Sequence, residues 1–215
     1  MTLHFDPNGR TAVPDWRFRD LLGPADWDRL PRAVRRRFSQ HMTESASTVY
    51  QGAVTTMRMN PFGRALAFAA RLIGSPLPYD RGSVGQPAVV TVTQDVAGHG
   101  QFWVRHYGRR TGFPQVVHSS KRFAGPTGLE EYVGCGIGMA LILRRQETSL
   151  LFVARHYFIQ IFGRRIRIPS WLSPGHLVIG HHDLGAGRFR FSLDLTHRFL
   201  GRMIHQDAVF QDPKE

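Results

Sequence analysis

An alternation of apolar and polar residues with a period of two runs through the second half of the chain. It is clearest from Arg188 to Leu195, where Phe189, Phe191 and Leu193 alternate with polar or charged residues. Because successive side chains of a β-strand point to opposite faces, this pattern predicts a strand with one buried face. Similar segments recur from Pro87 onward, separated by glycine-containing turns. About eight to ten such strands at short spacing predict an antiparallel meander, not strand–helix–strand units.

A sheet of this length is expected to curl, because curling deals with its exposed edges. We therefore predict a strand-dominated α+β fold, in which residues 48–210 form a long antiparallel meander curled into a barrel or half-barrel. Residues 62–73 are apolar at helical spacing and end at Gly74, which predicts a helix packed against the barrel or plugging it. This helix is apolar all round, so we expect it to be covered on more than one side. Residues 15–40 predict one or two short amphipathic helices, and residues 1–215 are expected to form one domain.

The chain is strongly basic, with a formal net charge of +12 that rests on 28 lysine and arginine residues. Such a charge attracts anions but does not specify a fold. The arginines of the first helical segment could contact an acidic protein or an anionic membrane surface, although a solvated face is the simpler interpretation of such a run. These arginines are Arg32, Arg35, Arg36 and Arg37. Nucleic acid is disfavoured as a partner, because neither a recognisable binding module nor interleaved aromatic residues accompany the basic ones.

Several site types are disfavoured by composition. Cys135 is the single cysteine, so no internal disulfide and no cluster of thiolates can form. The glycine-rich segment 134–138 resembles a phosphate-binding loop, but residues 139–143 after it predict a strand where such a loop needs a helix. We therefore expect no cofactor and no metal. Residues 1–10 contain no apolar run of signal-peptide length, and arginines interrupt the longer apolar stretches, so we expect a soluble, cytoplasmic protein.

Two His-x-Asp pairs, His181 with Asp183 and His205 with Asp207, have the spacing of two ligands on one face of a strand. If the turns centre near residues 185–186 and 199–200, the two pairs lie more than about 10 Å apart along the neighbouring strand and cannot share a metal. Both pairs are then predicted on the face opposite Phe189, where ion pairing in solvent is the simpler interpretation.

Residues suited to acid–base chemistry also occur within apolar strand patterns. His156 is predicted on the same face as Phe152, and His106 lies in another such strand. One of Glu130 and Glu131 must face inward if their segment is a strand, where an arginine would pair with it. These two histidines and two glutamates are the catalytic candidates, since perturbed titratable groups collect in clefts, although a structural role is the simpler reading of each. The candidates for lining a cavity are Phe152, Phe158, Phe189, Phe191 and Leu193.

Several short segments, in this order, resemble the bacterial family called domain of unknown function 4166. They are Phe-Arg-Asp-Leu-Leu-Gly at 18–23, Leu-Pro at 30–31 with Arg-Arg-Phe at 36–38, residues 63–66 and 71–78, Gly-Leu-Glu-Glu-Tyr-Val-Gly at 128–134, Pro-Ser-Trp-Leu-Ser-Pro at 169–174, and Gly-Arg-Phe-Arg-Phe at 187–191. The resemblance implies a domain that occurs alone or attached to a nucleotide-binding, reductase-like domain. It implies no reaction and no catalytic residue.

Three functions remain open from these observations. The first is noncatalytic binding of a small apolar or amphipathic ligand in the cavity of the curved sheet. The second is an enzyme, or an accessory domain of one, that acts on a hydrophobic substrate with a histidine and a glutamate within hydrogen-bond reach. The third is a docking module for a separately encoded reductase-like partner.

Overall fold

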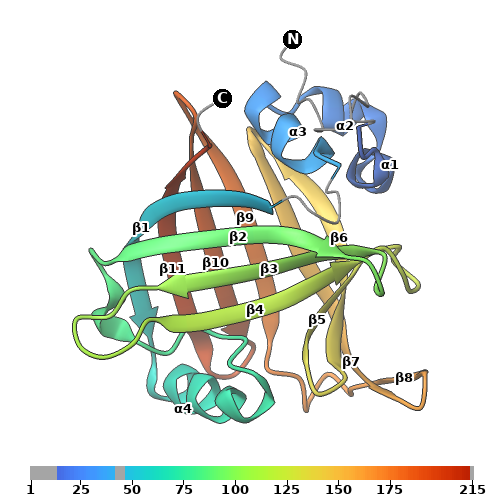
Figure 1. Ribbon diagram of the computed structural model, residues 1–215. Coiled ribbons are helices and arrows are strands. Elements are labelled where there is room, and N and C mark those ends of the chain that lie inside the picture. The colour runs from blue at the N-terminus through green and yellow to red at the C-terminus, as the bar shows by residue number, and fades with distance from the viewer. Residues whose placement is uncertain (1–13, 42–46, 214–215) are drawn as a thin grey trace.

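The computed structural model describes residues 14–41 and 47–213, and the segment 1–10 that we searched for a signal peptide lies outside them. Eleven antiparallel strands follow one another along the sheet, and β6 pairs with β7 as well as with β5. This pairing closes ten of the strands into a barrel and leaves β8 attached to the outside of β7 (Figure 1). The strands are β1 (Ser47–Met59), β2 (Pro87–Asp95), β3 (Gly100–Tyr107), β4 (Gln115–Arg122), β5 (Glu130–Gly134), β6 (Ile137–Gln146), β7 (Ser149–Ile161), β8 (Arg164–Arg167), β9 (His176–Gly185), β10 (Arg188–His197) and β11 (Gly201–Gln211). The predicted curled meander is confirmed.

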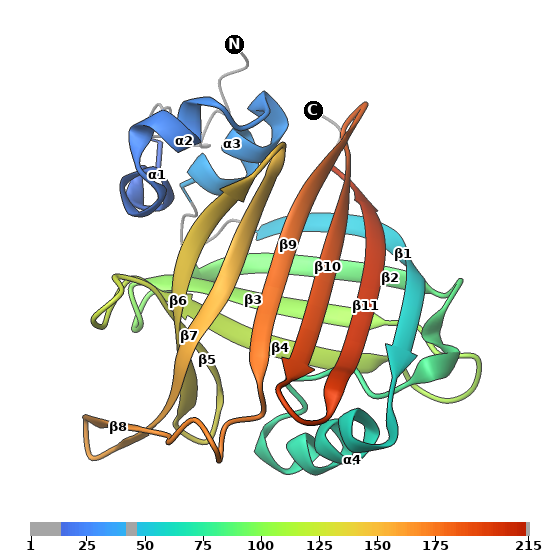
Figure 2. The same cartoon turned by 180° about the vertical axis from the view of Figure 1, so that it is seen from behind.

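Helices cover the two ends of the barrel. Three short ones, α1 (Arg17–Leu22), α2 (Pro24–Asp28) and α3 (Arg32–Ser39), pack at the end near the termini, where we had predicted one or two. At the opposite end lies α4 (Pro61–Ala69), continued by the 3-10 turn η1 (Ala70–Ile73); a second 3-10 turn, η2 (Arg81–Ser83), precedes β2. Figure 2, the view from behind, shows the same arrangement, with α4 below the lower ends of β10 and β11.

The sequence of α4 explains where this helix begins and how it attaches to the barrel. The side chain of Asn60 accepts a hydrogen bond from the Gly63 amide at 2.8 Å and donates one to the Leu200 carbonyl at 2.9 Å. Pro61 occupies the first helical position, where no amide hydrogen is needed. Gly63 lies so close to β11 that a Cβ there would stand 2.0 Å from the Met203 carbonyl oxygen.

The outer side of α4 and η1 is not covered, contrary to our expectation of cover on more than one side. Phe62 is 55% exposed, Phe68 65% and Leu72 88%. Ala67 and Gly63 face the barrel and are buried. The pattern of apolar residues predicted the helix correctly, but only one side of it finds a partner within the described residues.

Two bulges change which side chains enter the barrel. The first, next to Arg188, pairs His181 with Phe191 instead of Arg190, so His181 faces inward and is buried. The prediction that this His-x-Asp pair lies outside was therefore wrong. The second pair is on the outer face as predicted, with His205 opposite Asp194.

The second bulge inserts one extra residue into β7 opposite the step from Ala140 to Leu141. Ala154 still faces the interior, but the next inward side chain is Tyr157, not His156. The predicted placement of His156 on the face of Phe152 was wrong for this reason. Phe158 is likewise displaced from the interior, and its ring packs against Tyr132. A single added residue exchanges the two faces of a strand.

Aromatic side chains fill the end of the barrel nearest α1–α3. Phe38 of α3 reaches inward and packs on Phe152 of β7, with ring centroids 5.5 Å apart, and on Phe18 of α1 at 5.3 Å. Arg37 anchors the same helix, because its Nε lies 2.6 Å from Asp212 Oδ1 and its guanidinium lies 4.1 Å from the centre of the Phe189 ring. Phe152, Phe189 and Phe191, which we named as cavity residues, are packed in this end of the interior.

Candidate functional site

The hydrogen-bonded wall of the barrel is interrupted along one side of β7. Residues 149–153 of β7 pair with β9, and residues 158–161 pair with β8. Between these two ladders, residues 154–157 have no strand partner on that side. A single hydrogen bond of 2.8 Å, from the Ile168 amide to the Tyr157 carbonyl, is made between the two ladders. The segment 168–175 crosses this opening. β7 therefore separates from β9 in the wall of an otherwise paired barrel.

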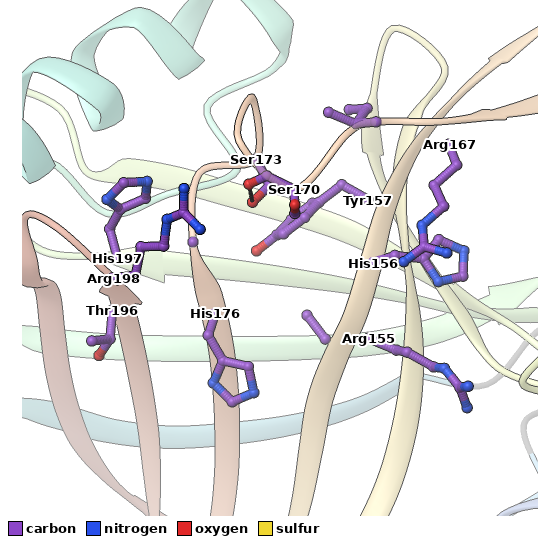
Figure 3. Close-up of a pocket in the computed structure, with 13 residues that line it drawn as sticks. Arg155, His156, Tyr157, Arg167, Ser170, Ser173, His176, Thr196, His197 and Arg198 are labelled. Carbon is purple, nitrogen blue, oxygen red and sulfur yellow. Dashed lines mark hydrogen bonds between the residues drawn. The ribbon is translucent and has the colours of Figure 1, made fainter.

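A pocket of about 240 Å³ lies at this opening. Its outer parts come from the segment after β8, the start of β9 and the turn between β10 and β11. Its inner part includes Ala154 and Tyr157, two side chains of the barrel interior. Figure 3 shows the Tyr157 ring projecting toward the gap near Ser170 and His176, while His156 lies on the other side of β7 beside Arg167. The pocket thus connects the outer surface with a residue of the interior wall.

A buried polar cluster continues from Tyr157 across the inner faces of β3, β4 and β5. Lys121 lies 3.0 Å from Glu131 Oε1, and Ser119 donates a hydrogen bond of 2.6 Å to the same oxygen. Arg105 donates to the Ser119 hydroxyl at 3.4 Å. All four side chains are nearly inaccessible to solvent. Among the described residues, Arg105 has no carboxylate within salt-bridge distance, so the cluster carries an unpaired cation.

The electrostatics of the cluster follow from burial and these contacts. Burial alone would raise the pKa of Glu131, but Lys121, Arg105 and the hydrogen bond from Ser119 hold that pKa below its ordinary value. Burial also lowers the pKa of Lys121, against the attraction of Glu131. Burial, together with the Glu131 charge, raises the pKa of the Tyr157 hydroxyl above its ordinary value. Tyr157 is therefore a neutral donor next to an ionised carboxylate.

Several buried polar atoms on the inner wall have no hydrogen-bond partner among the described residues. They are Glu131 Oε2, the Tyr157 hydroxyl, Trp103 Nε1, His181 Nδ1 and both polar atoms of the Gln206 amide. Gln206 is fully buried on β11, between Ile204 and Ala208, which also face inward. Buried polar groups are ordinarily hydrogen-bonded, and each that is not costs about 1–3 kcal/mol. These atoms therefore indicate where water or a ligand supplies the missing hydrogen bonds.

The structure separates the four residues that we named as catalytic candidates. Glu131 faces inward, as one of the two glutamates had to, although its partner is Lys121 and not an arginine. Glu130 faces outward, where its carboxylate binds Arg165 at 2.8 Å and accepts a hydrogen bond from Tyr132 at 2.9 Å. His106 is on the outer face of β3.

His156 lines the rim of the pocket without a partner for Nδ1, and burial together with Arg167 and Arg155 lowers its pKa. Among the described residues, no histidine forms a hydrogen bond with either Glu130 or Glu131. The geometry that the enzyme hypothesis required is not formed. Leu193, the fifth candidate for lining a cavity, faces inward on β10 and is buried.

The arginines of α3 do not form the free basic surface that we predicted. Arg37 is buried against Asp212, and Arg36 also reaches Asp212, at 3.9 Å. Arg35 lies 3.9 Å from Asp28, so only Arg32 of the four projects without a described carboxylate nearby. In a run of arginines on a short helix, the sequence shows the charge but not the acidic residues that the fold brings to it.

Sequence reasoning missed Arg105, Lys121, Tyr157 and Gln206. Lys121 had a usable signal, because it lies in step with Val117 and Ser119 on the inner face of β4 and is one of two lysines among 28 basic residues. Gln206 similarly lies in step with Ile204 and Ala208. Tyr157 had no such signal, since the bulge in β7 reverses its face.

Two structural features bear on the kind of site. Within residues 14–41 and 47–213, no three histidine, cysteine, aspartate or glutamate side chains come together as metal ligands. No helix in the described part of the chain is long and apolar enough to span a bilayer.

The closed wall, the capped ends and the opening beside β7 define an antiparallel ten-stranded barrel with a partly polar interior. The chain belongs to the family described as "Domain of unknown function (DUF4166)", whose model matches residues 30–210. No curated protein matches the chain. A solved structure with similarity is that of a mutant of the fluorescent protein UnaG, with 10% sequence identity and a TM-score of 0.34, covering 78% of this chain and 96% of that one.

Proposed function

We propose that the barrel is a noncatalytic binding domain for a small amphipathic molecule that enters between β7 and β9. The observation that carries the proposal is the set of buried, unpartnered polar atoms on the inner wall, above all the two atoms of Gln206. A fully apolar lining would be more stable, so polar groups kept in the interior without partners favour a ligand that supplies the missing hydrogen bonds.

The chemistry of the wall describes the ligand. Gln206 and Glu131 offer acceptors, whereas Tyr157 and Arg105 offer donors, so the polar end of the ligand both donates and accepts. The surplus positive charge of Arg105 favours an acidic group at that end. The remaining inner wall near the opening is aliphatic, with Leu177, Leu193, Leu195, Met139 and Ile204. This combination suits a molecule with a hydrocarbon body and one polar end.

The pocket beside β7 supports this route of entry. It is the place where the ladder between neighbouring strands is interrupted, and Tyr157 links it to the interior. Ala154 is the smallest side chain of the inner part of that pocket. A large side chain there would obstruct the opening without touching the polar cluster.

The test is native mass spectrometry of the purified chain, together with titration by a fluorescent fatty acid. We expect a bound small molecule, or saturable probe binding at one site per chain. Gln206→Leu is expected to weaken probe binding by about tenfold, the effect of one lost hydrogen bond to a buried group. Ala154→Trp is expected to slow or abolish it.

Gln115→Leu is the matched control, since Gln115 is also buried but has hydrogen-bond partners. It donates to the Leu77 carbonyl at 2.9 Å and accepts from the Tyr79 amide at 3.0 Å. Its probe affinity should equal that of the unaltered chain under conditions where both are folded. Absence of any adduct and of saturable probe binding would refute the proposal. So would equal weakening by the Gln206 and Gln115 substitutions.

A further inference from the structure

Exposed apolar side chains gather at the end of the barrel that carries α4. They project from four separate segments: α4 with η1, the β7–β8 hairpin, the segment after β8, and the turn between β10 and β11. Both ribbon views place these four segments at the same end, opposite the termini (Figures 1 and 2). The exposed apolar residues are Phe62, Phe68, Leu72, Phe162, Ile166, Trp171, Leu172 and Phe199, which we call the apolar tips. Single exposed apolar residues are common, but such a group at one end marks an interaction surface.

The segments that carry the apolar tips add positive charge and no acidic residue of their own. The three stretches that supply them, residues 59–79, 148–182 and 195–206, contain eight arginines and not one aspartate or glutamate. Among the described residues, two of these arginines have carboxylate partners, Arg165 with Glu130 and Arg202 with Asp194. Arg64, Arg71, Arg155, Arg164, Arg167 and Arg198 have none.

Arginine and apolar side chains are also paired within this surface. The guanidinium of Arg198 lies 4.2 Å from the centre of the Phe199 ring, and that of Arg71 lies 5.1 Å from the Phe68 ring. Arg64, Phe68 and Arg71 line one shallow groove along α4. Phe68 and Phe199 thus each present an apolar group with a cation beside it, the arrangement that suits the boundary between lipid headgroups and acyl chains.

We infer that this end of the barrel binds the surface of an anionic lipid membrane, with the apolar tips inserted among the headgroups and the six free arginines on the lipid phosphates. Two observations favour a bilayer over a protein partner. The apolar residues are dispersed over four protruding segments and do not form one continuous groove, so a deformable surface accommodates them best. The excess positive charge of these segments requires an acidic counterpart over the whole end. The inference does not depend on the ligand proposed for the interior.

The first test is sedimentation of the full chain with vesicles. We expect binding to vesicles of phosphatidylcholine with about 30% phosphatidylglycerol and little binding to phosphatidylcholine alone, with loss of binding as salt rises. Leu72→Ser combined with Phe162→Ser should reduce binding to the anionic vesicles by at least about tenfold, because two buried apolar contacts are lost. Leu184→Ser is the matched control, since Leu184 is an exposed residue of the β9–β10 hairpin at the other end.

The charge is tested in the same assay. Arg64→Gln combined with Arg167→Gln should weaken binding by about 25-fold, at roughly fivefold for each arginine near an anionic surface. Arg32→Gln combined with Arg188→Gln removes the same charge from exposed positions at the end near the termini. This control should reduce binding only slightly, through the lower net charge. Equal losses from the two pairs would overturn the inference, since they would indicate attraction by net charge alone.

Trp171 provides a direct readout of insertion, because its ring is largely exposed at one tip. Anionic vesicles should shift the tryptophan emission to shorter wavelength, and the shift should disappear in Trp171→Phe. Failure of the chain to bind anionic vesicles at low salt would overturn the inference. A dimer in light scattering that the Leu72→Ser and Phe162→Ser substitutions dissociate would also overturn it, by assigning the tips to a second copy of the chain.

Discussion

Trp103 on β3 and His181 on β9 meet in the middle of the barrel, with ring centroids 5.8 Å apart. Their strands are five positions apart in either direction around the ring of ten, so the two side chains come from opposite walls. The lumen is therefore filled at this level by its own side chains. The rings of Phe38, Phe152, Phe189 and Phe191 also pack against His181. Any ligand in the barrel is confined to the half nearer α4.

His181 makes the stability of the fold depend on pH. Burial, followed by the charges of Arg37, Lys121 and Arg105, lowers the pKa of His181 well below its ordinary value of 6.5. As pH falls below about 6.5, the unfolded chain binds a proton that the folded chain does not, so the free energy of unfolding decreases. The loss reaches at most about 1.4 kcal/mol per pH unit for this residue.

His181→Gln should reduce that pH dependence in urea unfolding between pH 7.5 and 5.5. His106→Gln, a change at an exposed position, should leave it unaltered. An unchanged slope in His181→Gln would show that His181 binds a proton as readily in the folded chain as in the unfolded chain.

Removing Glu131 alone should destabilise the fold more than replacing both residues of the buried pair that it forms with Lys121. Glu131→Gln leaves Lys121 buried without a countercharge and is expected to lower the free energy of unfolding by about 3–5 kcal/mol. Combining Lys121→Met with Glu131→Leu removes both charges and should destabilise less than Glu131→Gln alone. Chemical denaturation of the two single variants and the double variant measures the coupling. Additive effects would mean that the 3.0 Å contact contributes nothing.

Gln206 and Gln115 should respond oppositely to the same substitution. Gln206→Leu replaces an amide without partners and is expected to raise the free energy of unfolding by about 1 kcal/mol. Gln115→Leu leaves the Leu77 carbonyl and the Tyr79 amide without their hydrogen-bond partner and should lower the free energy of unfolding by about 1–3 kcal/mol. Thermal unfolding of both variants measures the two changes in stability. A destabilised Gln206→Leu would show that the amide has permanent partners, such as ordered water.

Arg37 should contribute far more to stability than its neighbour Arg35. Arg37→Met leaves the buried Asp212 with only the 3.9 Å contact to Arg36 and should cost about 3–5 kcal/mol. Arg35→Met removes an exposed contact of 3.9 Å with Asp28 and should cost less than about 1 kcal/mol. Comparison of the two denaturation midpoints checks this, and equal shifts would contradict the assignment of Arg37 as the anchor of α3.

The alternation of residues was sufficient to predict the strands and the curled sheet, because a period of two depends only on burial of one face. Closure was not predictable, since it rests on the pairing of the first strand, β1, with the last, β11, which lie far apart in the chain and leave no mark of their pairing in the sequence. The helix over residues 62–73 was predicted from spacing and from Gly74, and it extends from Pro61 to Ile73.

The residues of the candidate site were harder to predict, and the bulges are the reason. One inserted residue moved His156 out and Tyr157 in, and another turned His181 inward. The alternation of residues does not reveal these positions, because a bulge is a shift in register against the partner strand, β6 for β7 and β10 for β9. The inward glutamate was foreseen only as one of two, and its partner Lys121 was not considered.

The position of β8 outside the closed ring has a consequence for solubility. A closed barrel offers no strand edge to another chain, but β8 pairs only with β7, so its far side is a free edge among the described strands. Three of its four residues are arginines, at 164, 165 and 167. Two copies that approached through this edge would bring several arginines of like charge close together. The resistance of the chain to edge-to-edge aggregation therefore depends on the charge of the four residues of β8.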